Sequence, residues 1–204
     1  RVKTINTLDS LIDTYQLQLF ENTGSLTRPE FTLVDDDYMD GSTRFLEFEN
    51  AAMTFGDLDG DGDEDMLMGN LFGTITYYKN EAAPGQNADL QLQGQGLLDA
   101  SGLPIDIGAL SAPELFDYDD DGDLDLFAGD RFGKITYFEN IGDANNFSFN
   151  KITSQWGGIN IRLIPTGYEF AGRTKTRFID YDNDDTTELI LATEEGYIQV
   201  YEDL

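Results

Sequence analysis

The chain has 204 residues, of which 40% are hydrophobic and 12% aromatic, so it can build a real core over one or two domains. Its formal net charge of -28 argues against nucleic acid and anionic lipid as partners, because phosphate recognition needs a basic surface. Without cysteine or histidine, it has no disulfide, no thiol chemistry and no structural zinc site of the usual kind. No apolar run approaches the roughly 18 residues of a membrane-spanning helix, so we expect no membrane insertion.

The predicted strands recur in chain order with a period of about 60 residues. Short apolar runs predict buried strands, and alternating runs predict strands with one polar face. The apolar runs are 66–69, 126–129 and 189–192, and the alternating runs are 16–22, 74–80, 134–140 and 197–203. A further predicted strand precedes each apolar run, at 51–55, 112–116 and 176–179, and outer strands are expected at 30–34 and 147–152.

An acidic loop joins the first predicted strand of a repeat to the second. The three loops are 57–65, 117–125 and 180–188, and acids occupy loop positions 1, 3, 5 and 9 each time. Alternate residues of a tightly wound loop turn their carboxylates to one centre, and position 7 can add a backbone carbonyl, which suits calcium. The alternative is a solvated acidic turn, which three copies in phase disfavour.

These loops supply the predicted calcium ligands. The first loop offers Asp57, Asp59, Asp61, Asp63 and Asp65; the second offers Asp117, Asp119, Asp121, Asp123 and Asp125; the third offers Asp180, Asp182, Asp184, Thr186 and Glu188. Gly62 and Gly122 permit a sharp bend at position 6. Asp185 replaces this glycine in the third loop and Glu188 replaces the last aspartate, so we expect a weaker or variable third site.

Each repeat therefore predicts four short antiparallel strands. Such a sheet has two apolar faces that it cannot bury alone, and radial stacking of sheets as blades solves this problem. The expected fold class is all-β, a β-propeller. The chain offers roughly three and a half of the about four to eight blades of known propellers, so we expect part of a larger propeller. We treat 1–204 as one partial domain with repeats at approximately 1–34, 50–94, 111–153 and 175–204, completed by further sequence or another chain.

The chain resembles the FG-GAP / VCBS repeat family, relatives of the integrin alpha-subunit propeller. The matching pieces are Ser111-Ala-Pro113, the Asp-x-Asp-x-Asp-Gly-x-x-Asp loop, the Phe-Gly turn, and the Tyr/Phe-Glu-Asn-x-Gly segments at 138–142 and 20–24. The resemblance implies a calcium-stabilised propeller, secreted or displayed on a cell surface, that serves adhesion, carbohydrate contact or assembly.

Other calcium folds fit these loops poorly. An EF-hand needs a bidentate glutamate at position 12, where this chain has Met68, Ala128 and Leu191. Dockerin-like modules place a helix after the loop, whereas an apolar β run follows here. The calcium β-roll needs rows of Gly-Gly-x-Gly-x-Asp, which are absent.

Several residues outside the loops have two interpretations. The acidic tract 35–41 lacks ligand spacing, so we expect a solvated loop. Trp156 can stack on a sugar ring, or it can pack at a blade interface, which we favour. Tyr168, Arg162 and Arg173 can bind an acidic ligand, but we favour pairing with the chain's own carboxylates. The repeated aromatics are expected to be packing residues: Tyr77, Tyr78, Tyr137, Phe138 and Tyr201.

The expected function is an extracellular or cell-surface module for adhesion, recognition or scaffolding, with a protein or glycan ligand. No histidine or cysteine is present as a base or nucleophile, and the obvious acids are assigned to metal. We therefore expect a non-enzymatic module. The alternative is the propeller domain of a secreted polysaccharide-degrading enzyme, either a lyase or a glycosidase.

Overall fold

The computed structural model describes residues 2–5, 11–14, 17–38, 50–83, 86–94, 96–161, 173–194, 196 and 198–202. The chain divides into two compact units, Arg1–Glu49 and Asn50–Leu204, and each is considered separately. The described residues form strands, turns and one short 3-10 turn, η2 (Trp156–Gly158). The predicted all-β class is confirmed.

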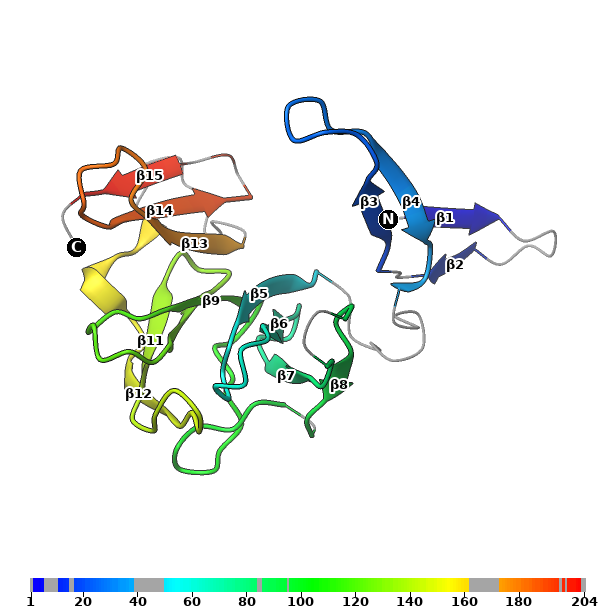
Figure 1. The fold of residues 1–204 in the computed structure, drawn as a ribbon. Helices are drawn as coiled ribbons and strands as arrows, with labels where there is room; N and C mark the ends of the chain where they lie inside the picture. Colours follow the sequence, from blue (N-terminus) through cyan, green and yellow to red (C-terminus); the bar gives the residue numbers. More distant parts are fainter. Residues whose placement is uncertain are drawn as a thin grey trace. The chain divides into compact units, whose positions relative to one another are not determined.

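The first unit contains two antiparallel hairpins (Figure 1). One joins β1 (Val2–Ile5) to β2 (Leu11–Thr14), which the sequence patterns did not predict. The other joins β3 (Leu19–Asn22) to β4 (Phe31–Asp35), the predicted third and outer strands of a repeat.

The second unit contains three antiparallel sheets that follow the 60-residue repeat (Figure 1). The first consists of β5 (Ala52–Gly56), β6 (Asp65–Gly69), β7 (Ile75–Asn80) and β8 (Leu90–Leu92). The second consists of β9 (Ala112–Phe116), β10 (Asp125–Gly129), β11 (Ile135–Asn140) and β12 (Phe149–Thr153). The third has β13 (Thr174–Ile179), β14 (Glu188–Thr193) and β15 (Ile198–Tyr201). In each sheet the strands lie in chain order, so the predicted four-stranded antiparallel sheet is confirmed for the first two.

The second strand of each sheet is the most buried, because both of its faces are covered. All five residues of β6 and of β10 are buried, as their continuous apolar runs predict. Each acidic loop joins the first strand to this buried second strand. The loop is therefore attached to the most firmly packed part of its sheet.

The hydrophobic core lies between successive sheets. One cluster joins Leu67, Ile75 and Tyr77 of the first sheet to Phe138 and Phe149 of the second. The next cluster joins the second sheet to the third and consists of Phe127, Ile135, Tyr137, Ile159, Ile161, Phe178, Leu189 and Leu191. Trp156 packs against this second cluster, with its ring centroid 5.1 Å from that of Phe127 and 5.9 Å from that of Phe178. The preferred packing interpretation of Trp156 therefore agrees with its position.

The start of the first strand of each following sheet lies so close to the second strand of the preceding sheet that this second strand ends in glycine. A Cβ atom at Gly69 would clash with the carbonyl oxygen of Ser111, and one at Gly129 would clash with that of Thr174. The Ser111 hydroxyl also accepts a hydrogen bond from Asn70 N at 2.8 Å and donates one to Thr74 O at 2.8 Å. Adjacent sheets are thus joined by direct backbone approach as well as by apolar packing.

An asparagine at the end of the third strand organises the turn that follows. Asn140 Oδ1 accepts hydrogen bonds from Gly142 N at 3.1 Å and Ser148 N at 2.7 Å. Asn22 and Asn80 each accept two backbone hydrogen bonds in the same way. The repeated Asn therefore marks the entry to the outer strand, including β8, which the sequence patterns missed.

The close approach at Gly129 generates a stability prediction. Gly129→Ala is expected to lower the free energy of unfolding by about 3 kcal/mol, because the new methyl group forces backbone apart. Urea denaturation measures the loss. The control is the reverse change at the equivalent place in the third sheet, Ala192→Gly, with an expected cost of about 1 kcal/mol or less. Equal effects of the two changes would contradict the prediction.

Candidate metal centres

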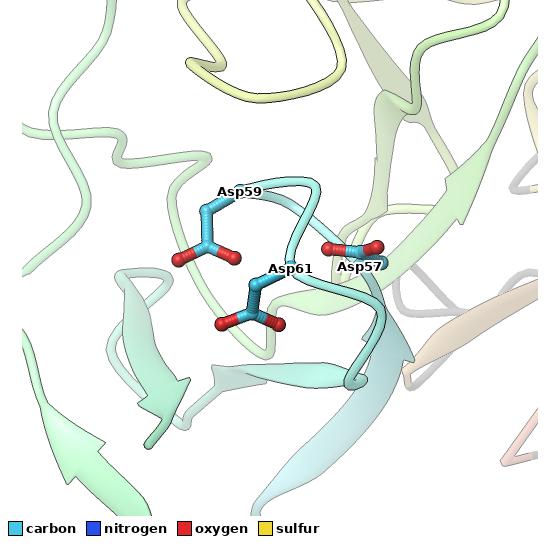
Figure 2. A group of neighbouring side chains, drawn as sticks. All are labelled: Asp57, Asp59 and Asp61. Carbon is cyan, nitrogen blue, oxygen red and sulfur yellow. The ribbon is translucent and has the colours of Figure 1, made fainter. Parts of the chain in front are cut away.

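Each acidic loop gathers three carboxylates around one point. The groups are Asp57, Asp59 and Asp61; Asp117, Asp119 and Asp121; and Asp180, Asp182 and Glu188, with one oxygen of each residue within 4.8 Å of the others in its group. Figure 2 shows the three side chains of the first group, all carried by the loop between β5 and β6. Calcium–oxygen distances of about 2.3–2.6 Å let ligands of one ion lie up to about 5 Å apart, so this spacing suits a shared cation.

The same two backbone hydrogen bonds shape all three loops. The amide at position 6 donates to the carboxylate at position 1, from Gly62 to Asp57 at 3.0 Å, and equivalently in the other loops. The amide at position 7 donates to the carboxylate at position 5, from Asp63 to Asp61 at 3.0 Å, and again equivalently elsewhere. The third loop therefore keeps the winding of the other two despite its altered sequence.

The winding needs two left-handed residues. At position 6, Gly62 and Gly122 have φ angles of 91° and 93°, and Asp185 has 69°, as expected for an aspartate in this place. Position 4 is also left-handed in every loop, at Gly60, Asp120 and Asn183, with φ angles of 72°, 59° and 63°. Position 4 was not predicted from the sequence, although glycine, aspartate and asparagine are the residue types that tolerate this conformation.

The carboxylate at position 9 attaches the loop to its sheet. Asp65 is fully buried and accepts hydrogen bonds from Leu58 N at 3.2 Å, the Tyr77 hydroxyl at 3.0 Å and Asn80 N at 2.8 Å. Asp125 is held in the same way by Tyr118 N, the Tyr137 hydroxyl and Asn140 N. Burial raises the pKa of both carboxyls, and these hydrogen bonds oppose the rise. Neither residue belongs to the tight three-carboxylate group of its loop.

In the third sheet, different residues attach the position 9 carboxylate of the loop to the sheet. Val200 stands where Tyr77 and Tyr137 stand, so the hydroxyl donor is missing. Glu188 is one methylene longer than aspartate and joins the tight group. It still accepts from Tyr181 N at 3.0 Å, and the Thr186 hydroxyl lies 3.2 Å from its other oxygen. The Thr186 hydroxyl also donates to Asp184 at 2.6 Å, which lowers the pKa of that carboxyl and keeps Asp184 outside the group.

The second loop has the strongest repulsion among its own carboxylates, and Asp123 shows it. Asp123 is buried, at 7% exposure, and burial together with its four neighbouring loop carboxylates raises its pKa to about 6. Buried oxygens of Asp117 and Asp123, and one of Asp59 in the first loop, have no hydrogen-bond partner. Orphaned buried carboxylate oxygens are costly unless a cation meets them, so the loops fit a divalent ion. The sequence analysis assigned Asp123 only through its backbone carbonyl.

The first loop differs from the other two in local charge, because a lysine side chain from the third strand lies beside its carboxylates. Lys79, on β7, forms an ion pair with Asp59 and lies 3.7 Å from Asp61. The equivalent residues of the other sheets are Glu139 and Glu202. The three loops therefore share one backbone geometry but differ in local charge.

The other candidate residues are placed as follows. Arg173 is buried and donates to the backbone carbonyls of Asn50 and Ala51, just before β5, and among the described residues it forms no ion pair with a carboxylate. The described part of the acidic tract, Asp35 to Tyr38, is exposed or half-buried. Arg162 and Tyr168 lie outside the described residues.

A small cavity lies where the first strands of the three sheets meet. It has a volume of about 70 Å³ and is lined by Ala52, Met53, Ala112, Pro113, Glu114, Lys175 and Thr176. This volume suits one or two water molecules, whereas ligand pockets typically reach about 300 Å³ or more. Among the described residues, no helix has the length and apolar character needed to cross a membrane.

Comparison with protein-family models and with curated proteins finds no match to this chain. The interpretation of the loops therefore depends on their own geometry.

The raised pKa of Asp123 predicts how metal-free stability changes with pH. Protonated Asp123 is favoured in the folded state, so its contribution is fully present below pH 4 and is lost as the pH rises through about 6. We expect this residue to account for about 3 kcal/mol of destabilisation over that range. Denaturant unfolding in chelator at several pH values measures it. Asp123→Asn should remove this component, and an identical pH profile for the variant would contradict the prediction.

Proposed function

We propose that the three loops are calcium sites that brace the sheets of this protein. The observation that carries the proposal is the set of orphaned, buried carboxylate oxygens in the first two loops, whose carboxylates already converge. The third loop is included because its carboxylates also converge and its backbone has the same winding. Oxygen-only ligands around a flexible loop favour calcium over zinc or copper. Bound calcium would supply the positive charge that the loops lack and would hold the end of the first strand of each sheet to the start of the second.

The sheets are further proposed to be blades of a β-propeller. Support comes from the repeated sheet-to-sheet packing and from the faces that lack it in the first and last repeats. Ile198 on β15 is 72% exposed, whereas its equivalents Ile75 and Ile135 are fully buried under the next sheet. Val200 is 44% exposed, whereas the tyrosines in its place, Tyr77 and Tyr137, are buried. In the first unit, Phe20 and Phe31 are exposed, although their equivalents Phe138 and Phe149 are buried. Further blades, from additional sequence or another chain, would cover these faces.

The resemblance to FG-GAP / VCBS repeats then favours an extracellular or cell-surface module. We propose adhesion, recognition or scaffolding as its role, with a protein or glycan ligand. The strong negative charge of the chain repels nucleic acids and anionic lipids, so these are disfavoured as ligands. Calcium loops of this kind suit compartments with millimolar calcium, where the sites would remain filled.

The calcium proposal predicts a ligand-dependent melting temperature. An ion that binds only the folded state raises stability with its concentration, so millimolar calcium should raise the melting temperature above that in chelator. Asp121→Ala removes one carboxylate of the second group and should reduce this increase. The matched control is Asp36→Ala, an exposed acid outside the three groups, which should leave the increase intact. Identical melting curves in calcium and chelator would refute the calcium sites.

The recognition role is tested separately from the metal sites. The calcium-loaded chain should bind a subset of a glycan array or capture a surface protein by pull-down, and binding should be lost in chelator together with the fold. Measurable cleavage of a polysaccharide by the purified chain, removed by a point change outside the loops, would overturn the non-enzymatic role.

A further inference from the structure

We propose that Lys79 is a tethered cation that competes with calcium for the first loop, so that this loop fills at higher calcium concentrations than the second. The inference rests on the proposed calcium sites and adds a difference between two loops of the same backbone geometry. The loops of the different sheets should therefore fill at different calcium concentrations, because each loop has its own local charge.

The contacts of Lys79 place its charge inside the group that would hold the ion. Its ammonium pairs with Asp59 and lies 3.7 Å from Asp61, and both acids belong to the tight three-carboxylate group. A divalent ion at that group and an ammonium beside it repel each other. Calcium must therefore displace the lysine or bind beside it, and either event weakens the first site.

Calcium can also displace the Lys79 ammonium from the carboxylates of Asp59 and Asp61. Its side chain is 32% exposed, and Asp59 and Asp61 are 18% and 41% exposed, so solvent reaches the pair. Solvent weakens an ion pair that it can reach, so the pair can give way to a divalent ion that several carboxylates share. The lysine therefore shifts the calcium affinity without abolishing the site.

The second loop is the internal comparison. Glu139 occupies the place of Lys79 there, and no ion pair with a described lysine or arginine is recorded for the loop acids. One buried oxygen each of Asp117 and Asp123 in the second loop, and of Asp59 in the first, has no hydrogen-bond partner, so the loops differ in the counter-ion and not in this respect. Among the described residues, the first loop thus has an internal counter-ion and the second has none.

The test follows each loop separately in a calcium titration of the 204-residue chain labelled with ¹⁵N-glycine. Gly62 and Gly122 report on the first and second loops, because each donates its amide to the position 1 carboxylate of its own loop. In the unmodified chain, the Gly62 resonance should move at about tenfold higher calcium than that of Gly122. Lys79→Met should lower the Gly62 midpoint about tenfold and leave the Gly122 midpoint unchanged, while Glu139→Lys should raise the Gly122 midpoint.

The matched control is Lys134→Met, which removes one lysine charge from the turn between β10 and β11, at the opposite end of the second sheet from its loop. It should move neither midpoint. A second measurement separates a counter-ion from a packing role. Lys79→Met should lower the melting temperature in chelator and enlarge the increase that calcium produces, whereas a packing loss would lower both melting temperatures equally.

The outcomes are distinct. Equal midpoints for the two glycines in the unmodified chain, or a Gly62 midpoint unaffected by Lys79→Met, would overturn the inference and leave the calcium sites in place. If neither resonance moves in excess calcium, both the sites and the inference are wrong.

Discussion

A buried carboxylate at the end of each acidic loop is the constraint on which the rest of the structure depends. Removing a carboxylate from water is costly unless hydrogen bonds meet it. In the first two sheets, the donors are the amide at the start of the loop, a tyrosine hydroxyl and an amide at the end of the third strand. These donors fix both ends of the loop against the sheet. Because the ends are fixed, the alternate residues between them have little choice of direction, and their carboxylates converge.

The strands could be predicted because their signal is local and repeated. The apolar runs of four residues after the acidic loops form β6, β10 and β14; they are buried throughout in the first two sheets, and in alternation with half-buried residues in the third. The repeated Asn marks the end of the third strand in the first two sheets. β8 was missed because only three residues, Leu90 to Leu92, form it, and Gln91 interrupts their apolar character. Its place depends on the hydrogen bonds that Asn80 makes to the following turn, which no apolar pattern reports.

The candidate sites were predictable in outline only. Acid spacing identified the loops, and the structure groups the carboxylates of positions 1 and 3 in all of them. Position 5 completes the first two groups, whereas Glu188 completes the third, because its longer side chain reaches the centre and Thr186 holds Asp184 aside. The ion pair of Lys79 with Asp59 depends on a neighbouring strand, β7, and the burial of Asp123 depends on how its loop packs. Those effects join residues that are distant in sequence, so spacing within a loop could not reveal them.

The packing between sheets gives the loops an influence beyond their own repeat. Each sheet buries its second strand against a neighbour, and a loop is attached directly to that strand. In an array of this kind, stability is approximately the sum of each repeat's own stability and its nearest-neighbour interfaces. Carboxylate repulsion within one loop therefore weakens the interface on both sides of its sheet, and neutralising that repulsion strengthens both. The first loop has an internal lysine, whereas the acids of the second loop have no lysine or arginine partner among the described residues. The dependence on a cation would then differ from sheet to sheet, and the sheet β9–β12, which lies between two interfaces, would depend on it most.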